Sequence, residues 1–441
     1  MVKSEWKVKN TQLKTETLFT LDLMYSAESI YMNLHNYIKY FNFKQRLKVV
    51  LLLTFSLFFL FSLNSCNKEN QRAKGINKIA FGSGLNLDSS LVVLDSIAAK
   101  KPDVWVWMGN SIFTDKNENK SLKAKFYNLS VTNNYRNLLD SVKNILAIWD
   151  EYDYGMEDGN KYFKNKLKAK KEFLDFLEIP QNAPIRKRNG IYSSYTIGEE
   201  FKKIRIILLD TRTFQDQLLT NPNYDLVKNK DHYTLFNAIK NNNLDSVIDI
   251  SLFPNLYEHY KLDSNVLNHK MHNNYITKIF AKYMPKDSAD LLGKEQWQWL
   301  YNTLKHSDAR INIIVSNLQI IPTEQLDEKW ANFPNSRQKL FEIISETKTK
   351  GIIFLSGNRG KSEISKINLP NIDYPIYEIT SSGLNFSDNK NYIEYNSHRV
   401  GQQIKEKSFG MLSFKWKIKE VKVKVELLGE KGVYQVLNLR Y

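Results

Sequence analysis

The chain is predicted to be an α/β protein, on two observations. Short apolar runs rich in β-branched residues alternate with stretches of helical spacing, and glycine or polar residues bound each run. The end of the chain differs, because Val421, Val423 and Val425 alternate with charged residues in the period-two pattern of a half-buried strand. We therefore expect one α/β body whose sheet system ends in an antiparallel C-terminal strand section.

The elements of this body follow in order along the chain. The predicted strands are 76–81, 104–108, 145–149, 204–209, 311–315, 352–355, 411–417, 421–426 and 433–439. The predicted helices are 87–99, 295–304 and 337–348. Residues 217–290 carry few strong signals and many Asn, Tyr and His, so we interpret them as an insertion that covers or decorates the body. No second core is expected, and residues 76–441 are predicted to form one domain.

The charge of the chain is strongly positive but dispersed. The 441 residues carry a formal net charge of +16, which lysine dominates, and 42% of them are hydrophobic, as in globular proteins. The densest lysine run, 164–171, is interpreted as the solvated face of a helix. We expect no nucleic-acid binding, because a nucleic-acid-binding surface concentrates its basic residues.

An export signal is predicted near the N-terminus. Basic residues precede an apolar run at 49–63, which is shorter than the roughly 20 residues of a spanning helix. The sequence Leu63-Asn64-Ser65-Cys66 then resembles a bacterial lipobox, in which the cysteine is lipidated and becomes the first mature residue. Cys66 is the single cysteine of the chain, so no disulfide is expected within it. An uncleaved membrane anchor is the alternative.

These features divide the first part of the chain into three segments. Residues 1–45 form an N-terminal extension, and Met32 lies at a more usual distance from the signal, which favours a mis-assigned start. Residues 46–66 form the lipoprotein signal peptide, and residues 67–75 form a polar tether. We expect an extracytoplasmic protein, held to a membrane through the lipid on Cys66, at the periplasmic face or the cell surface. Protein partners stay unspecified.

Polar segments follow several predicted strands, where functional residues of α/β proteins collect. Three of them are Gly109-Asn110-Ser111, Asp150-Glu151-Tyr152-Asp153 and Ser356-Gly357-Asn358-Arg359-Gly360. A hard cation needs converging oxygens, and Asp150, Glu151 and Asp153 supply them. Such loops equally serve to cap strands and hold turns, so from spacing alone both roles stay open.

The order of these segments resembles the successive blocks of the alkaline phosphatase D (PhoD-like) metallophosphatases, over nearly all of residues 76–412. Blocks that match the family pattern are L-L-D-T-R at 208–212, L-G-x-x-Q-W-x-W-L at 292–300, E-x-W-x-x-F-P-x-x-R at 328–337 and T-S-S-G-L at 380–384. The resemblance implies a metallophosphatase-like four-layer α/β/β/α sandwich with a metal site at the strand ends, which in the family holds Fe-, Ca- or Zn-type metals.

The departures from the family pattern fall on the residues that the family uses for chemistry. Gly84 stands where the family has a metal-ligating cysteine, Asn110 where it has a metal-bridging aspartate, and Ser111 where it has an asparagine. Other departures are Glu151 and Tyr152 at an aspartate-histidine pair, Asn358 and Gly360 at the aspartate and histidine of L-S-G-D-R-H, and Phe386 near a further histidine. The resemblance thus implies an eroded metal site made of Asn110, Asp150, Glu151, Asp153 and Asn358, with Tyr152 and Arg359 at catalytic positions.

These departures change the expected activity. Two-metal hydrolysis needs anionic ligands and a bound water of lowered pKa, whereas asparagine offers no charge and glycine no ligand. Tyrosine, with a pKa of about 10, replaces imidazole poorly near neutral pH. We expect either no cofactor or a single weakly held divalent cation, and a pseudophosphatase with a binding or structural role.

Three other hypotheses about the site and the chain stay open. Arg359, with Asn110 and Asn358, is a candidate pocket for a phosphate ester or another anion. The protein is alternatively an active metal-dependent hydrolase of phosphomonoesters or phosphodiesters. The third hypothesis is an interaction protein whose active surface is the insertion at 217–290.

Overall fold

The chain divides into two compact units, residues 1–72 and 73–441. The computed structural model describes residues 75–113, 121–221, 281–387 and 394–441, all in the second unit. The predicted extension, signal peptide and Cys66 lie outside the described residues, as do nearly all of the tether and most of the insertion, so these stay predictions. Within the described ranges, no helix is both long enough and apolar enough to cross a membrane.

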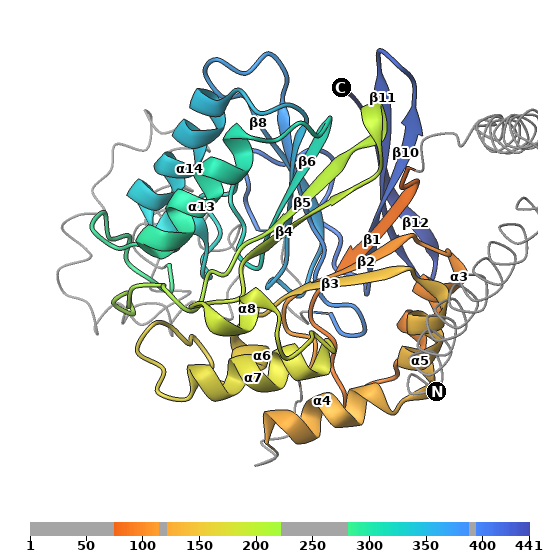
Figure 1. Cartoon of the computed structure of the whole chain (residues 1–441), viewed down its shortest axis with the longest axis vertical. Helices are drawn as coiled ribbons and strands as arrows, with labels where there is room; N and C mark the ends of the chain where they lie inside the picture. Colours follow the sequence, from red (N-terminus) through yellow and green to blue (C-terminus); the bar gives the residue numbers. More distant parts are fainter. Residues whose placement is uncertain (1–74, 114–120, 222–280, 388–393) are drawn as a thin grey trace, which may run out of the picture. The chain divides into compact units, whose positions relative to one another are not determined.

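The described strands form two six-stranded mixed sheets (Figure 1). The first sheet has the order β12-β11-β10-β1-β2-β3, and the second has the order β4-β5-β6-β7-β9-β8. The strands of the first sheet are β1 (Lys78–Gly82), β2 (Val104–Met108), β3 (Asn144–Ile148), β10 (Phe409–Trp416), β11 (Val421–Gly429) and β12 (Gly432–Arg440). Those of the second are β4 (Ser193–Ile197), β5 (Ile204–Leu208), β6 (Ile311–Ser316), β7 (Ile352–Ser356), β8 (Glu363–Ile367) and β9 (Ile376–Thr380).

Each sheet combines parallel with antiparallel strands. In the first sheet β1, β2 and β3 run parallel, and β10 pairs antiparallel with β1 and β11. In the second sheet β5, β6, β7 and β9 run parallel, with β4 and β8 antiparallel at the two edges. The predicted antiparallel section at the end of the chain is confirmed as β10, β11 and β12.

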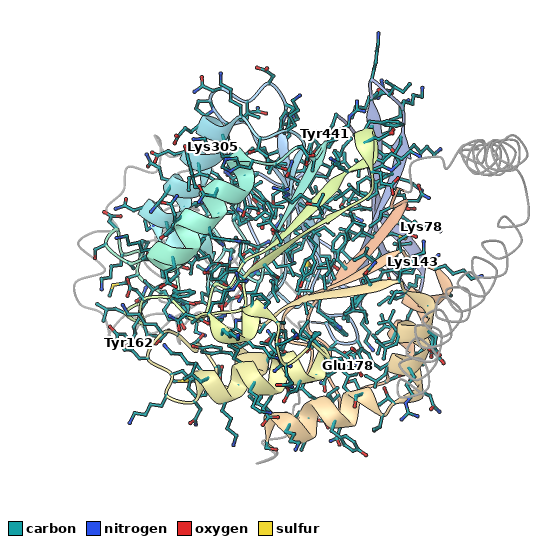
Figure 2. The ribbon with its side chains drawn as sticks, in the orientation of Figure 1. Lys78, Lys143, Tyr162, Glu178, Lys305 and Tyr441 are labelled. Carbon is teal, nitrogen blue, oxygen red and sulfur yellow. The ribbon has the colours of Figure 1, made fainter. Side chains whose placement is uncertain are left out.

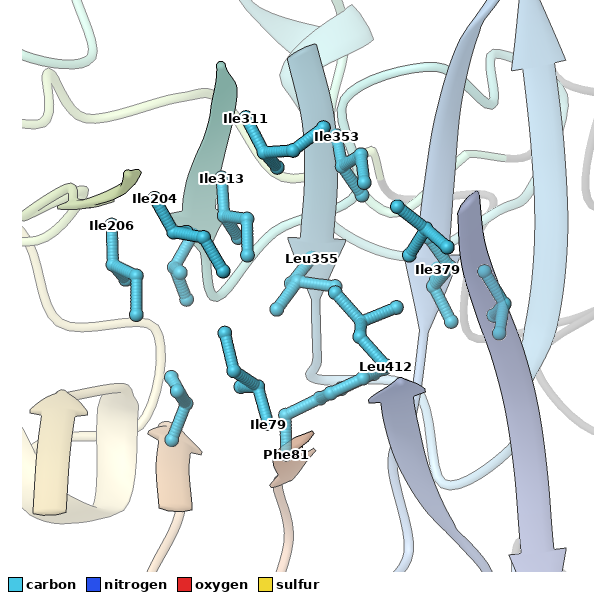
Figure 3. Packing of buried hydrophobic residues seen from close by; sticks show 14 of the residues in the cluster. Ile79, Phe81, Ile204, Ile206, Ile311, Ile313, Ile353, Leu355, Ile379 and Leu412 are labelled. Carbon is cyan, nitrogen blue, oxygen red and sulfur yellow. The ribbon is translucent and has the colours of Figure 1, made fainter. Parts of the chain in front are cut away.

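The two sheets pack face to face through buried apolar side chains. Figure 3 shows Ile79 and Leu412 of the first sheet opposite Ile313 and Leu355 of the second, and all four side chains are fully buried. Alternate residues of each strand face this layer, so a strand with both faces covered reads as a continuous apolar run. This explains why the central strands were predictable from the sequence.

Helices cover the outer face of each sheet (Figure 1). The first sheet is covered by α3 (Val92–Ala99), α4 (Leu122–Ser130), α5 (Asn133–Ser141) and α7 (Lys166–Phe176), and the second by α13 (Gly293–Lys305) and α14 (Pro334–Thr347). Short helices α6 (Glu151–Tyr154) and α8 (Pro184–Lys187) and the 3-10 turns η1 (Glu200–Lys202) and η4 (Trp330–Asn332) lie in connections. The predicted four-layer α/β/β/α sandwich is confirmed.

The lysines are dispersed over the unit, with one exception to the predicted solvated run. Figure 2 shows Lys305 and Lys143 on opposite sides of the drawn unit. Within the run at 164–171, the prediction is wrong for Lys170, whose exposed fraction is 6%. Its ammonium group donates to the carbonyl oxygens of Arg186, at 3.3 Å, and of Arg188. Helix α7 therefore directs the Lys170 side chain into the protein, where backbone carbonyl oxygens take the place of hydrating water.

The two described ends of the predicted insertion pair with each other. Thr220 and Tyr283 form an antiparallel bridge. The backbone N–H of Asn221 donates to the carbonyl of Lys282 at 2.8 Å, and that of Met284 to the carbonyl of Leu219 at 3.2 Å. The chain thus leaves and re-enters the body at adjacent positions on either side of residues 222–280.

Candidate functional site

The candidate site lies where β2, β3 and β7 end. Asn110 follows β2, Asp150 follows β3 and Asn358 follows β7. Asn110 and Asn358 both have a left-handed backbone, with φ of 53° and 54°. Among residues with a side chain, asparagine and aspartate adopt this conformation most readily. The backbone therefore restricts both positions to a few residue types, and the exchange of aspartate for asparagine respects that restriction.

The amide of Asn110 joins the two later strand ends. Its Nδ2 donates to Asp150 Oδ2 at 3.0 Å and to Asn358 Oδ1 at 3.2 Å, although Asn358 is 248 positions away in the sequence. Its Oδ1 accepts the backbone N–H of Tyr152 at 3.1 Å. This third bond fixes the orientation of the amide, because the flipped side chain would place oxygen against oxygen and N–H against N–H. A neutral hydrogen-bond donor thus lies between the two oxygens.

A buried arginine neutralises Asp150. Arg212 donates through Nε at 2.9 Å and Nη2 at 2.6 Å to Asp150 Oδ1, and both side chains have no exposed surface. Asn317 Nδ2 donates to the same oxygen at 2.5 Å. Arg212 also pairs with Glu328 at 2.8 Å, and these carboxylates keep its pKa above the ordinary value. Both oxygens of Asp150 therefore have protein donors, and its charge has a protein counter-ion.

Asp153 holds the turn after β3. Its Oδ1 accepts the hydroxyl of Ser111 at 2.6 Å and the backbone N–H of Ser111 at 2.9 Å. Its Oδ2 accepts the backbone N–H of Asp150 at 3.1 Å, at the start of α6. Asp153 is fully buried. The structure places this carboxylate beneath the strand ends, where it satisfies backbone donors.

A cavity of about 440 Å³ lies above these strand ends. Its charged lining consists of the carboxylates Glu151, Asp158, Asp327 and Glu328 and the cations Lys282 and Arg359. Asn110, Asn358 and Tyr152 also line it, whereas Asp150 and Asp153 lie behind its wall. The structure thus brings five of the seven predicted site residues to one cavity. Their roles as metal ligands or catalytic groups stay predictions.

Glu151 is the cavity carboxylate without a counter-ion. Its Oε2 accepts the backbone N–H of Asp158 at 3.1 Å, and no cation of the described residues lies within ion-pair distance. Burial and the neighbouring Asp150 carboxylate raise the pKa of Glu151 to about 8. The other carboxylates are paired: Asp158 with Lys282 at 2.8 Å, Asp327 with Arg359 at 2.6 Å, and Glu328 with Arg212.

Arg359 differs from the sequence-based expectation of a free anion ligand. Its side chain is 1% exposed, and it pairs with Asp327 and with Glu394, which also pairs with Lys361 at 3.2 Å. These two carboxylates keep the pKa of Arg359 above the ordinary value, against the effect of burial. The positive charge of Arg359 is therefore balanced within the protein.

Aromatic rings form one wall of the cavity. Phe113 lies 4.6 Å from Tyr152 and 5.4 Å from Phe386, measured between ring centroids. Phe386 also packs over Gly84, where an added Cβ would lie 3.0 Å from the ring and 3.2 Å from the backbone nitrogen of Gly383. Gly84 has a φ of 71°, which also favours glycine. A side chain at position 84, such as the cysteine of the family pattern, would strain this backbone and require its neighbours to shift.

The donor set does not fit a pair of divalent cations. A donor, the Asn110 amide, lies between the oxygens of Asp150 and Asn358, and Arg212 neutralises Asp150. Across the described ranges, no group of three or more His, Cys, Asp and Glu side chains is arranged to hold a metal ion. Hard cations need several converging, uncompensated oxygen ligands.

Sequence reasoning missed the residues that neutralise this site. Arg212 and Glu328 lie in blocks that match the family pattern, and no role was assigned to them. Asn317 directly follows β6. The rule that functional residues follow parallel strands would have selected it. The ion pairs of Asp158 and Asp327 join residues far apart in the chain, and no local pattern signals them.

Comparison with known proteins agrees with this architecture. A model of the family described as "PhoD-like phosphatase" matches residues 130–419, which is more than half of the 441 residues. The matched range begins after the segments at Gly84 and Asn110, so the family pattern at those two segments rests on the resemblance alone. A comparison with curated protein sequences gives no match.

Two solved structures are similar to this chain at low identity. A structure of PhoD is similar with a TM-score of 0.53 and 14% identity, covering 83% of this chain and 70% of that one. A purple acid phosphatase, PPD1 from yellow lupin (Lupinus luteus) seeds, is similar with a TM-score of 0.48 and 8% identity, covering 83% of this chain and 54% of that one. At such identity the likeness to PhoD establishes the fold alone, and the activity must be argued from the site.

Proposed function

The chain belongs to the PhoD-like phosphatase family, and we propose that it is a pseudophosphatase, a protein that keeps the fold but acts by binding. One observation carries this proposal. The Asn110 amide donates to both Asp150 Oδ2 and Asn358 Oδ1. In a metal centre at these strand ends the two oxygens would face a cation, whereas here they face a neutral donor. Hydrogen bonds from Asn110 take the place of the negative charge that an aspartate would carry at this position, so the fold is stable without metal.

The charges around this amide support the same proposal. Arg212 supplies the positive charge that Asp150 needs, and burial makes that pair costly to separate. Asp150 and Arg212 both match the family pattern, so the distinguishing contact is the Asn110 amide, which donates to Asp150 Oδ2 where a cation would lie. No hydrolytic step is therefore assigned to Tyr152 or Arg359.

We place the protein outside the cytoplasm, anchored to a membrane through lipid on Cys66. This part of the proposal is supported by the sequence pattern of the signal and the lipobox. A second candidate function, an active phosphoesterase with one weakly held cation, is favoured by the uncompensated carboxylate of Glu151 in the cavity.

A turnover assay separates the two functions. The full chain in a non-ionic detergent is incubated with p-nitrophenyl phosphate and bis(p-nitrophenyl) phosphate, with chelator or with added Fe, Ca, Zn or Mn ions. We expect hydrolysis no faster than that of the Glu151→Ala variant under every condition. Metal-dependent turnover that disappears in Glu151→Ala, with unchanged thermal unfolding, would establish the active phosphoesterase instead.

A further inference from the structure

The cavity above the strand ends combines one uncompensated carboxylate with an aromatic wall, and we propose that it binds a small organic ammonium ion. This inference rests on the proposed function in one respect, which is that the cavity holds no catalytic metal pair. It differs from the sequence-based expectation of an anionic ligand, because the structure pairs Arg359 with two carboxylates.

Carboxylates outnumber cations in the lining of the cavity, four to two. Lys282 is paired with Asp158 and Arg359 with Asp327, while Glu328 is paired with Arg212 behind the wall. Glu151 has a single backbone donor and no ionic partner among the described side chains. An arriving phosphate would face this carboxylate with no free cation to balance it. An arriving cation would supply the missing counter-ion and favour the charged form of Glu151, whose pKa burial and Asp150 otherwise raise to about 8.

The aromatic wall selects an organic cation over a bare ion. Phe113, Tyr152 and Phe386 form a continuous cluster, with centroid separations of 4.6 and 5.4 Å, and all three rings line the cavity. All three are partly exposed. The negative face of an aromatic ring attracts an ammonium group within about 6 Å, and its apolar surface takes the attached methyl or methylene groups. A hydrated metal ion gains nothing comparable from such a wall.

The departures from the family pattern contribute to this wall. Phe386 lies near a family histidine and covers Gly84, where the Cβ of a cysteine would press tightly against the ring. Tyr152 stands at the histidine of the family's aspartate-histidine pair and contacts Phe113. Two of the residues that depart from the family pattern therefore contribute rings to the aromatic wall.

The binding test uses a matched pair of ligands. Choline and 3,3-dimethylbutan-1-ol have nearly the same shape, but only choline carries a charge. Each is titrated by calorimetry into the full chain in a maltoside detergent, after chelator treatment and elemental analysis that confirms the absence of metal. Inorganic phosphate is titrated in parallel. We expect choline to bind at least tenfold more tightly than the alcohol, and phosphate to show no binding.

Two variants with exposed controls locate the site. We expect Glu151→Gln and Phe386→Leu each to weaken choline binding at least fivefold. The controls Glu342→Gln and Tyr127→Leu, on exposed residues of α14 and α4, should leave it unchanged. Absent choline binding to folded, metal-free protein, equal binding of the alcohol, unchanged binding by both cavity variants, or binding of phosphate in place of choline would each overturn the inference. Metal-dependent turnover would instead refute the proposed function.

Discussion

At the scale of single residues, Asn110 satisfies two demands at once. The left-handed backbone after β2 favours asparagine and aspartate among residues with a side chain. The amide then joins Asp150 and Asn358, where a carboxylate would repel Asp150. We propose that this single exchange converts a place for a cation into a hydrogen-bonded junction.

The variant Asn110→Asp should be unstable without metal. It places a carboxylate 3.0 Å from Asp150 Oδ2 and removes both amide donors. We expect the free energy of unfolding to fall by about 3 kcal/mol, as for other broken buried ionic networks. Added Zn²⁺, Mn²⁺ or Ca²⁺ should restore part of the loss, because a cation now has an uncompensated ligand. Urea unfolding with and without each ion measures both effects.

The matched control is Asn110→Ala, which removes the donors without adding charge. It should be destabilised, and no divalent ion should restore it. If Asn110→Asp is as stable as the native chain in chelator, the amide junction does not have the role assigned to it.

Lys329 gives the stability of the protein a predictable pH dependence. This lysine is 2% exposed, and burial, with a smaller effect of Arg359, lowers its pKa to about 7. Between pH 7 and about 10.5 the unfolded chain therefore binds a proton that the folded chain does not. Lys329 should make the free energy of unfolding rise with pH across this window, by up to about 1.4 kcal/mol per pH unit.

Removing the amine should remove this contribution. In Lys329→Met the side chain keeps much of its apolar volume, and we expect a smaller pH slope of the unfolding free energy between pH 7 and 10. The exposed Lys350→Met should keep the native slope. Equal slopes for the native chain and Lys329→Met, measured by urea unfolding, would refute the assignment.

The limits of sequence reasoning are clear at this scale. The candidate residues could be selected because they follow strands, but their partners could not. The Asn110–Asn358 bond spans 248 positions, and the Arg212–Asp150 pair spans 62. Sequence spacing contains no information on such contacts, so it left Arg359 as an open anion ligand where the structure gives it two carboxylate partners.

At the scale of secondary structure, burial decided which elements were predictable. Strands such as β2 and β6 are buried along their whole length and read as apolar runs. The edge strand β4 is only partly buried and largely polar, and it was missed. In β9 the buried Glu378 interrupts the pattern. Its oxygens accept the backbone N–H groups of Ile320 at 2.8 Å and Ile321 at 2.6 Å, an arrangement that depends on tertiary contacts.

The paired ends of the insertion predict that it can be removed. Because the backbones of Asn221 and Lys282 are joined by a hydrogen bond, a short Gly-Ser linker can replace residues 222–280 without stretching the body. We expect the shortened chain to show native-like circular dichroism and a melting temperature within about 5 °C of the parent. Loss of cooperative unfolding would mean that the insertion is part of the core.

At the scale of the whole molecule, the lipobox predicts attachment to a membrane. In a bacterial host, the native chain should sediment with membranes and incorporate labelled fatty acid. Cys66→Ser should lose the label, because the chain has no other cysteine to accept it. Label retained by Cys66→Ser would exclude Cys66 as the acceptor, and unlabelled native chain in the membrane would favour an uncleaved anchor.

Our central proposal is that the strand ends joined by Asn110 are stabilised without metal. Elemental analysis of the purified protein, prepared without added chelator, tests this claim most directly. The hydrogen-bonded junction at Asn110 and the Arg212–Asp150 pair predict far less than one equivalent of iron, zinc, manganese or calcium. One or two tightly held equivalents, lost together with stability on chelation, would contradict the account and show that these strand ends still form a metal centre.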